Sequence, residues 1–411
     1  MKLLIVSQYF HPERFLINDI ARTLAARGHE VDVLTGKPNY PEGRYYQGYG
    51  FFGINREQWQ GVNIFRLPLA ARGRANAIRL IINYLSFVVS GLLLGPWALR
   101  GRRHDCVLVF ANSPLLKAIP AIFVSWIKRA PLLIWVQDLW PESLTATGHV
   151  NNSLVMSLVR KVVRFIYRHA DMLLVQSHAF EPSIRQLMPD AVIRYYPNSV
   201  DQVFDTPEHQ PGPCPAPMAD GFRVVFAGNI GSAQAPDVIV EAAAALADTP
   251  EIRLVMIGDG SKRAWMEQQA QQRGLTNLVF PGSFPLEQVP GLLAHADVLL
   301  ATLNKQPIFA LTIPSKIQSY MAMARPVVVS IDGEGARIVE EADCGLAVPA
   351  GDGAALAQAI RRLHATDAGQ RRQLGQNGRQ YYETHFGREH LMQELVTLCQ
   401  QAMNRDREHN Q

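Results

Sequence analysis

PIFALTIPSKIQSYMAMARPVVVS, residues 307–330, combines the start of a helix with a buried strand. Pro314 suits the first helical turn, because the N–H that proline lacks would have no partner there. The helix is expected to end at Arg325-Pro326, and Val327–Val329 then predict a strand that is covered on both faces. The expected apolar stripe of the helix is Ile317, Tyr320, Met321 and Met323.

Lys316 lies in the first turn of this helix. A helix N-terminus carries unpaired N–H groups and a positive dipole, so a lysine there is unfavourable unless an anion is also present. One interpretation is therefore a diphosphate site. The other is a solvated lysine at the start of an ordinary helix, and this segment alone does not separate the two.

Three glycine-containing loops that precede this helix favour the diphosphate interpretation. Gly228-Asn229 follows a strand at 223–227, Gly258-Asp259 follows a strand at 252–257, and Gly282-Ser283-Phe284 follows a short strand at 279–280. The carboxyl ends of parallel strands share one edge of a sheet, where ligands bind. Glycine loops at such an edge bring backbone N–H groups close to phosphate.

The N-terminal half starts with a strand at 3–6, a helix at 15–27 and a strand at 30–34, which predicts a second parallel sheet. The loop after the first strand, 7–14, contains His11 and Glu13. The loop at 36–53 is rich in glycine and aromatic residues, Tyr40 among them, and reads as a lid, an acceptor surface or a plain connection. No GxGxxG follows the first strand, so the dinucleotide fingerprint is absent.

Two carboxylates follow the strand expected at 132–136. Asp138 comes directly after its end and is suited to acid/base or hydroxyl-binding work. Glu142 comes after Pro141 and could serve the same chemistry or simply begin a helix.

Residues 72–103 form the most unusual segment, an apolar run with basic flanks and no acidic residue. The length is near that of a spanning helix, but a span would separate the strands of one sheet. We therefore expect helices that lie on an anionic membrane surface, and the alternative is a pair of buried helices. The flanking cations are Arg72, Arg74, Arg100, Arg102 and Arg103. A basic amphipathic helix at 157–169 could extend that surface.

The length of 411 residues predicts two domains, and a proline-rich linker is expected at 207–217. We place one domain at 1–205, a second at 206–385, and a terminal helix and tail at 386–411 that pack back on the first domain. A net charge of +4 is too small to indicate nucleic-acid binding. The four cysteines are far apart, which argues against zinc or a disulfide framework and fits the cytoplasm, and we expect no secretory signal.

Motifs along nearly the whole chain resemble those of the retaining GT-B glycosyltransferases of family 4, and within it the bacterial O-antigen and colanic-acid transferases, including those for N-acetyl-L-fucosamine. The motifs include RTLAARGHEVDVLT at 22–35, YPNSVD at 196–201, FAGNIGSAQAPDVIVEAA at 226–243, LVMIGDGSKR at 254–263, the opening segment, and GLAVPAGDGAAL at 345–356. The resemblance implies an α/β fold with two Rossmann-like parallel-sheet domains facing a cleft. It also implies sugar transfer from a UDP-sugar, with 1–205 as the acceptor-binding domain and 206–385 as the nucleotide-sugar-binding domain.

The resemblance implies the following site, with no obligatory metal or other cofactor. Asp138 and Lys316 would be catalytic. The substrate-binding residues would be His11, Glu13, Tyr40, Glu142, Gly228, Asn229, Gln234, Gly258, Asp259, Gly282, Ser283, Phe284, Thr312, Ile313, Pro314, Ser315 and Ser319. This chain departs from the family at Leu311 and Ser319, where two glutamates are usual, and at Gln234, where a lysine is usual. Lys316 would then replace the missing cation at the diphosphate.

The acceptor implied by the apolar and basic 72–103 segment is a polyprenyl-diphosphate-linked saccharide at the cytoplasmic face of the membrane. The protein would be a peripheral enzyme of O-antigen, lipopolysaccharide or capsule biosynthesis. Two alternatives stay open: a sugar-nucleotide 2-epimerase of the same fold, and a nucleotide-sugar-binding subunit without activity, which the two absent glutamates would fit.

Overall fold

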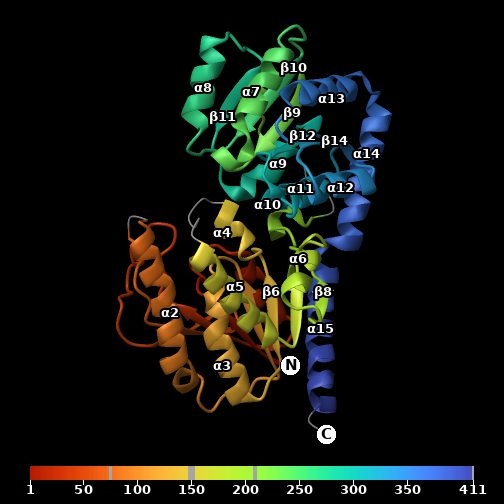
Figure 1. Cartoon of the computed structure of the whole chain (residues 1–411). Coiled ribbons are helices and arrows are strands. Elements are labelled where there is room, and N and C mark those ends of the chain that lie inside the picture. The colour runs from red at the N-terminus through yellow and green to blue at the C-terminus, as the bar shows by residue number, and fades with distance from the viewer. Residues whose placement is uncertain (74–75, 147–152, 207–210, 410–411) are drawn as a thin grey trace. The chain divides into compact units, whose positions relative to one another are not determined.

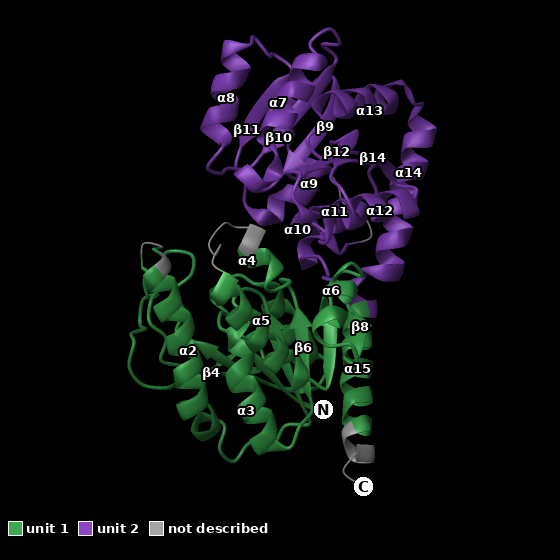
Figure 2. Ribbon diagram, in the orientation of Figure 1, with its two compact units in different colours: residues 1–197, 391–411 green, residues 198–390 purple. Residues whose placement is uncertain are grey.

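The computed structural model describes residues 1–73, 76–146, 153–206 and 211–409. The chain forms two compact units, which Figure 2 shows in different colours. Unit 1 comprises Met1–Pro197 and Leu391–Gln411, and unit 2 comprises Asn198–His390. The chain therefore passes from one unit to the other at Asn198 and returns at Leu391.

Unit 1 contains an eight-stranded sheet in the order β3-β4-β2-β1-β5-β6-β7-β8. All neighbours are parallel except β3 and β4, which form an antiparallel hairpin. The strands are β1 (Lys2–Val6), β2 (Glu30–Gly36), β3 (Asn55–Trp59), β4 (Val62–Leu67), β5 (Cys106–Ala111), β6 (Leu132–Val136), β7 (Met172–Val175) and β8 (Ile193–Tyr195). The central strands are apolar on both faces, as expected for a parallel sheet covered by helices.

Helices cover this sheet, as Figure 1 shows. One hydrophobic cluster joins Leu3 and Ile5 of β1 to Ile20 of α1 and to Leu395 of α15. Elsewhere α2 packs on α3, and α3 packs on α5. The helices are α1 (Leu16–Ala26), α2 (Ala77–Ala98), α3 (Ala118–Lys128), α4 (Glu142–Ala146), α5 (Ser153–Arg168), α6 (Phe180–Leu187) and α15 (Arg388–His409), which begins in unit 2.

α2 is a single helix of 22 residues, where we expected more than one helix in the 72–103 segment. Pro96 lies in the last turn, where the helix ends two residues later, so the bond that proline removes is at the helix end. Gly91 lets α2 approach α3, since a Cβ there would lie 2.6 Å from the Pro120 Cβ. Among the described residues, Ile78–Ala98 is the one stretch long and apolar enough to cross a membrane.

Unit 2 contains a six-stranded, wholly parallel sheet in the order β11-β10-β9-β12-β13-β14. Its strands are β9 (Phe222–Ala227), β10 (Ile252–Ile257), β11 (Leu278–Gly282), β12 (Val298–Thr302), β13 (Val327–Ser330) and β14 (Gly345–Val348). Its helices are α7 (Pro236–Ala245), α8 (Arg263–Gln272), α9 (Val289–Leu293), α10 (Pro307–Ala310), α11 (Ser315–Ala322), α12 (Glu334–Glu341), α13 (Gly353–Ala365) and α14 (Ala368–His385). The α/β fold with two parallel-sheet, Rossmann-like domains is therefore confirmed.

The segment 307–330 forms α10, α11 and β13. The predicted apolar stripe is confirmed, because Ile317, Tyr320, Met321 and Met323 all lie in the core of unit 2. Pro314 differs from our expectation by one position. It is the N-cap, with φ −61° and ψ 129°, and Ser315 is the first helical residue.

The proline-rich segment that we expected to be a linker packs on unit 2 where it is described. The Gly212 N–H donates to the Gly291 carbonyl over 3.1 Å, and His295 contacts the Gly212 carbonyl at 2.7 Å. Met218, just beyond the segment, is fully buried. Residues 207–210 lie outside the described residues.

Candidate active site

Three glycine loops meet at the carboxyl edge of the unit 2 sheet, after the neighbouring strands β9, β10 and β11. The Gly228 N–H donates to the Ile257 carbonyl, and the Gly258 N–H donates to the Gly282 carbonyl, both over 2.9 Å. A Cβ at Gly258 would lie 2.0 Å from the Gly228 oxygen, and φ there is +130°. This position therefore requires glycine, both for its backbone angle and for the close approach of the two loops.

Lys316 extends from the first turn of α11 over the first of these loops. A Cβ at Gly228 would lie 2.9 Å from the Lys316 Cε, so the side chain covers the glycine directly. The Lys316 Nζ donates to the Gln234 Oε1 over 2.9 Å and lies 4.6 Å from the centroid of the Phe226 ring. Lys316 and Gln234 thus occupy one site, although 82 residues separate them in the chain.

Burial lowers the pKa of Lys316 from 10.5 to about 8. No acidic side chain pairs with it among the described residues, and an amide oxygen with an aromatic face is a weak substitute for water around an ammonium. An anion at this point would restore the charged state. The charged lysine is therefore better stabilised in this site with a phosphate group bound than without one.

Two contacts hold α11 in place, and one of them joins it to the residue before the first glycine loop. The Tyr320 hydroxyl accepts a hydrogen bond from the Ala227 N–H at the end of β9, over 2.9 Å. The Gln318 side chain donates to the Asn198 carbonyl over 2.8 Å. Ser315 is exposed at the helix start, Thr312 and Ser319 are half-buried, and Ile313 is buried beneath the preceding turn.

The second glycine loop is held against the first by its own backbone. The Ile230 N–H donates to the Asp259 carbonyl over 2.8 Å, and the Asp259 carboxylate accepts from the Gly260 N–H over 2.8 Å. A Cβ at Gly260 would lie 2.7 Å from the Asn229 Oδ1. The structure therefore brings seven predicted residues together: Gly228, Asn229, Gln234, Gly258, Asp259, Gly282 and Lys316.

Phe284 packs on the hydrophobic core of unit 2, which includes Ala227 and Ile257 at the ends of β9 and β10. It lines a pocket of about 770 Å³ with Val203, Pro213 and Leu292, and none of the glycine-loop residues lines that pocket. Ser283, its neighbour, is exposed.

In unit 1 the corresponding edge lies at the ends of β1, β5 and β6. The chain runs from β1 through β2 to β4 on one side of β1 and then crosses to β5 on the other side, which makes β1/β5 the switch point where α/β sheets bind ligands. The Asp138 Oδ2 accepts from the Ser113 N–H over 2.6 Å, and the Trp140 indole donates to the Ser113 hydroxyl over 3.1 Å. Asp138 therefore lies at the sheet edge, as predicted, and is half-buried.

Lys117 is a buried cation at this edge that the sequence reasoning missed. Its side chain is inaccessible to solvent, and its Nζ bonds to the Asn112 Oδ1 and lies 6.0 Å from the centroid of the Tyr9 ring. Burial lowers the pKa of Lys117 to about 7, and the Asp138 charge opposes that shift. The only sequence signal was a single lysine in an otherwise apolar run, LLKAIPAIF, after a strand end.

Three aromatic rings and one arginine form a cluster beside Lys117. The Tyr9 ring lies 5.7 Å from Phe15 and 5.6 Å from Tyr40 between centroids. The Arg72 guanidinium lies 5.0 Å from the Tyr40 ring and 5.9 Å from the Tyr9 ring. Arg72, which we placed on a membrane-facing flank, instead packs on this cluster. The cluster offers a cation and flat apolar faces, which suit a phosphorylated saccharide.

Glu13 and His11 have structural contacts. Glu13 is buried, and its carboxylate accepts from the N–H groups of Phe10, Asn39 and Tyr40 over 2.7–3.1 Å. It therefore ties the loop after β1 to the loop after β2, and it faces backbone where we expected substrate. The His11 ring stacks on Trp59 at 4.3 Å, and burial lowers its pKa.

The loop at 36–53 is anchored along its length, which does not fit a mobile lid. The Tyr45 hydroxyl donates to the Leu69 carbonyl over 2.8 Å, and the Tyr46 hydroxyl donates to the Tyr40 carbonyl over 2.9 Å. Lys37 at its start is buried and bonds to the Asn55 side chain. Other residues of the loop are exposed, among them Glu42, Gln47 and Phe52, and Phe52 is 86% exposed.

Glu142 is the first residue of α4, in agreement with the second of the two interpretations we left open. Burial raises its pKa, while a hydrogen bond with Ser183 of α6 and the charge of Arg160 act in the opposite direction. Glu142 thus faces α6 and α5.

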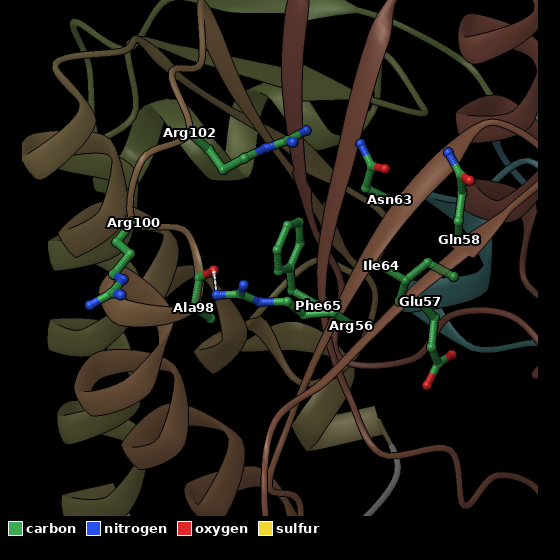
Figure 3. A pocket seen from close by; sticks show the side chains of 9 residues that line it. All are labelled: Arg56, Glu57, Gln58, Asn63, Ile64, Phe65, Ala98, Arg100 and Arg102. Atoms are coloured by element: carbon green, nitrogen blue, oxygen red, sulfur yellow. Dashed lines mark hydrogen bonds between the residues drawn. The ribbon is translucent and has the colours of Figure 1, made fainter.

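The basic residues after α2 line a pocket of about 400 Å³ (Figure 3). In it the Arg56 guanidinium donates to the Ala98 carbonyl over 3.2 Å, while Glu57 points away on the other side of the strand. Arg102 is ion-paired with Asp32 at 2.5 Å and Glu30 at 2.8 Å, so it stabilises unit 1 and is not a free surface cation as we expected. Arg100 and Arg103 are exposed, and Arg74 lies outside the described residues.

Comparison with known proteins gives two family matches that together span both units. A "Glycosyl transferase 4-like domain" matches residues 16–199, and "Glycosyl transferases group 1" matches residues 221–366. WcaI of Escherichia coli K12, described as a colanic acid biosynthesis glycosyl transferase, is 23% identical over 81% of this chain and 84% of its own length. WbjE of Pseudomonas aeruginosa, described as a glycosyltransferase, is 28% identical over 74% of this chain and 76% of its own.

Among solved structures, Anabaena HepE in complex with UDP superposes with a TM-score of 0.67 at 16% identity, covering 98% of this chain and all of that one. Identity at that level supports the fold, and the two family matches supply the activity. From its sequence matches and its two Rossmann-like domains, this chain belongs to the group 1, or family 4, glycosyltransferases of GT-B architecture.

Proposed function

We propose that this enzyme transfers a sugar, with retention at the anomeric carbon, from a UDP-sugar to a polyprenyl-diphosphate-linked saccharide during bacterial surface polysaccharide biosynthesis. The observation that carries the proposal is the position of the Lys316 ammonium, directly over Gly228 and 2.9 Å from Gln234. A cation and three glycine loops at one sheet edge, beside a helix N-terminus, match the chemistry of a diphosphate.

The nucleotide assignment to UDP is supported by relatives of the fold. HepE has been solved with UDP and with UDP-glucose. In this chain we assign the diphosphate to the backbone N–H groups of the glycine loops, the Lys316 Nζ and the Ser315 end of α11. Thr312, Ile313, Pro314 and Ser319 would shape the remainder of that pocket.

The reaction breaks the bond between the anomeric carbon and the diphosphate oxygen, and the acceptor hydroxyl oxygen forms the new bond while its proton leaves toward the departing phosphate. Negative charge therefore grows on the diphosphate, and Lys316 would stabilise it more in the transition state than in the ground state. Asp138 would hold the acceptor hydroxyl or stabilise the positive charge on the sugar ring. We propose that no protein-bound metal is required.

We assign the acceptor to unit 1 and the enzyme to the cytoplasmic face of the membrane. Along α2 an unbroken row of apolar side chains is 49–73% exposed: Ile78, Ile81, Ile82, Leu85, Val89, Leu93 and Trp97. At about 1.5 Å per residue this row extends for roughly 30 Å. Water is a poor partner for such a row, and Arg100 and Arg103 at its end suit anionic lipid.

Incubation of the purified protein with a panel of UDP-sugars, including UDP-glucose and UDP-N-acetyl-L-fucosamine, with and without bacterial membrane lipid, tests the proposal. We expect UDP release with one donor only when lipid acceptor is present, and loss of that release in Lys316→Met. Epimerised donor without lipid would support the 2-epimerase. Donor binding without any turnover would support a binding subunit. Either outcome would refute the proposal.

A further inference from the structure

A second basic pocket lies on α5, away from the residues assigned to donor and acceptor. Its volume is about 730 Å³, and one face of α5 together with the end of α6 lines it. The lining residues are Lys161, Arg164, Phe165, Arg168, His169 and Met188. The α5 members recur at intervals of three and four residues, so they form a single row on that helix.

The charges in this pocket are unbalanced. Lys161, Arg164 and Arg168 are exposed, no acidic residue lines the pocket, and none of the three has an ion pair among the described residues. The pocket in Figure 3 differs in this respect, since its Arg102 is paired with Asp32 and Glu30. Three like charges in one pocket repel one another, so an anion between them would lower the electrostatic energy.

Apolar and aromatic groups border the same pocket. Phe165, which forms one wall, is 44% exposed, and Leu158, two turns earlier on α5, is 62% exposed. The His169 ring contacts Phe165 at 4.5 Å and Trp126 of α3 at 5.2 Å between centroids, and Trp126 is 56% exposed. A cationic pocket next to exposed Trp, Phe and Leu has the composition of a membrane–water boundary.

We propose that this pocket binds the phosphate of an anionic phospholipid head group, with the adjacent apolar side chains in contact with the acyl chains. The volume is in the range of small-molecule sites and accommodates a glycerophosphate group. The inference deepens the membrane attachment in the proposed function and depends on it. It assigns lipid selectivity to α5, and general apolar attachment to α2.

The test is vesicle co-sedimentation of the full-length protein with phosphatidylglycerol/phosphatidylcholine vesicles and with pure phosphatidylcholine vesicles. The variant is Lys161→Gln, Arg164→Gln, Arg168→Gln. We expect it to bind the anionic vesicles about 100-fold more weakly, from roughly one kcal/mol per basic residue, with binding to phosphatidylcholine unchanged. The control removes the same charge from three exposed arginines of unit 2 that have no ion pair among the described residues, Arg273→Gln, Arg362→Gln, Arg372→Gln, and should bind as wild type.

Further arms separate the alternatives. Leu85→Ser, Leu93→Ser should weaken binding to both kinds of vesicle, and if it has no effect while the α5 variant does, the α2 attachment fails and the pocket stands. Equal binding of wild type and α5 variant to anionic vesicles overturns the inference. Binding of free glycerol phosphate that depends on Lys161, Arg164 and Arg168, together with equal vesicle binding by wild type and α5 variant, would also overturn the inference and indicate a site for free phosphate. If the α5 variant loses turnover in phospholipid-free detergent while its vesicle binding stays intact, the pocket belongs to the acceptor site and the inference is overturned.

Discussion

The carboxyl edges of the two sheets are built from different parts of the chain. The unit 2 edge consists largely of backbone, with Gly228, Gly258 and Gly282 at positive φ and one lysine above them. The unit 1 edge consists of side chains, chiefly Tyr9, Tyr40, Arg72 and Lys117. Backbone N–H groups can bind a phosphate whatever the side chains are, whereas side chains can be replaced by mutation without a change in the backbone. The difference suggests that unit 2 carries what the family shares and unit 1 carries what is particular to this enzyme.

Gly258→Ala should give the largest effect, because the new Cβ would lie 2.0 Å from the Gly228 oxygen and force the two loops apart. We expect UDP affinity to fall by roughly 100-fold or more, on the scale of several lost charge-assisted hydrogen bonds. Isothermal titration calorimetry measures it. The matched control is Gly274→Ala, which also has a positive φ, +64°, but no atom within 4 Å of the new Cβ. Wild-type UDP affinity in Gly258→Ala would refute the backbone account.

Arg72→Gln should change the acceptor and leave the donor alone. The guanidinium lies over the Tyr40 ring, so its loss removes a cation from the unit 1 edge. We expect the KM for the lipid acceptor to rise about tenfold, the effect of one charge-assisted contact, with UDP affinity unchanged. Arg194→Gln, an exposed arginine of the same unit, is the control. A shift in UDP affinity equal to that in acceptor KM would break the division between the two edges.

Glu13→Gln should reduce stability by about 1–3 kcal/mol, because one of three buried backbone N–H groups loses its acceptor. Burial raises the pKa of Glu13 from 4.5 to about 7. The folded wild type therefore binds more protons than the unfolded chain between these values, and its stability decreases as pH rises through that window. Urea unfolding should show a larger difference in the free energy of unfolding between wild type and variant at pH 5 than at pH 8. Exposed Glu42→Gln should show no gap at either pH.

Lys316→Met should make the ligand-free protein slightly more stable. The folded pKa of about 8 lies below 10.5, so the unfolded chain binds an extra proton between these values and the lysine destabilises the fold below pH 8. We expect a gain of ~1 kcal/mol at pH 7, which decreases as the pH rises from about 8 to 10.5. A loss of stability at pH 7 would indicate that Lys316 is a structural residue and not one held ready for an anion.

The sequence predicted regular elements better than contacts. The stripe of Ile317, Tyr320 and Met321 and the strand Val327–Ser330 were predictable, because helix and strand periodicities are local. The contact of Lys316 with Gln234 could not be predicted from local patterns, since the two residues are 82 positions apart. The resemblance did predict that Lys316 replaces the lysine that is usual at position 234. Periodicity also could not reveal that Pro96 lies within the last turn of α2.

Buried charge was the hardest feature to predict. Lys117 is surrounded in sequence by apolar residues, and its partner Asn112 precedes the helix that carries it. Glu13 was expected to face substrate because it lies on a loop after a strand. Its carboxylate instead accepts hydrogen bonds from the backbone N–H groups of Asn39 and Tyr40, in the loop after the next strand. In both cases the partner is supplied by loop geometry, which composition and spacing do not encode.

The most direct test of the central claim, that Lys316 binds the donor diphosphate, is the affinity for UDP measured by calorimetry between pH 7.5 and 9.5 in wild type and Lys316→Met. Since the pKa of Lys316 in the protein without ligand is about 8, the account predicts that the affinity of the wild type for UDP falls roughly tenfold or more across this range. The affinity of the variant should be lower at pH 7.5 and independent of pH. A wild-type affinity that does not change with pH, or a variant that keeps the same slope, would contradict the account.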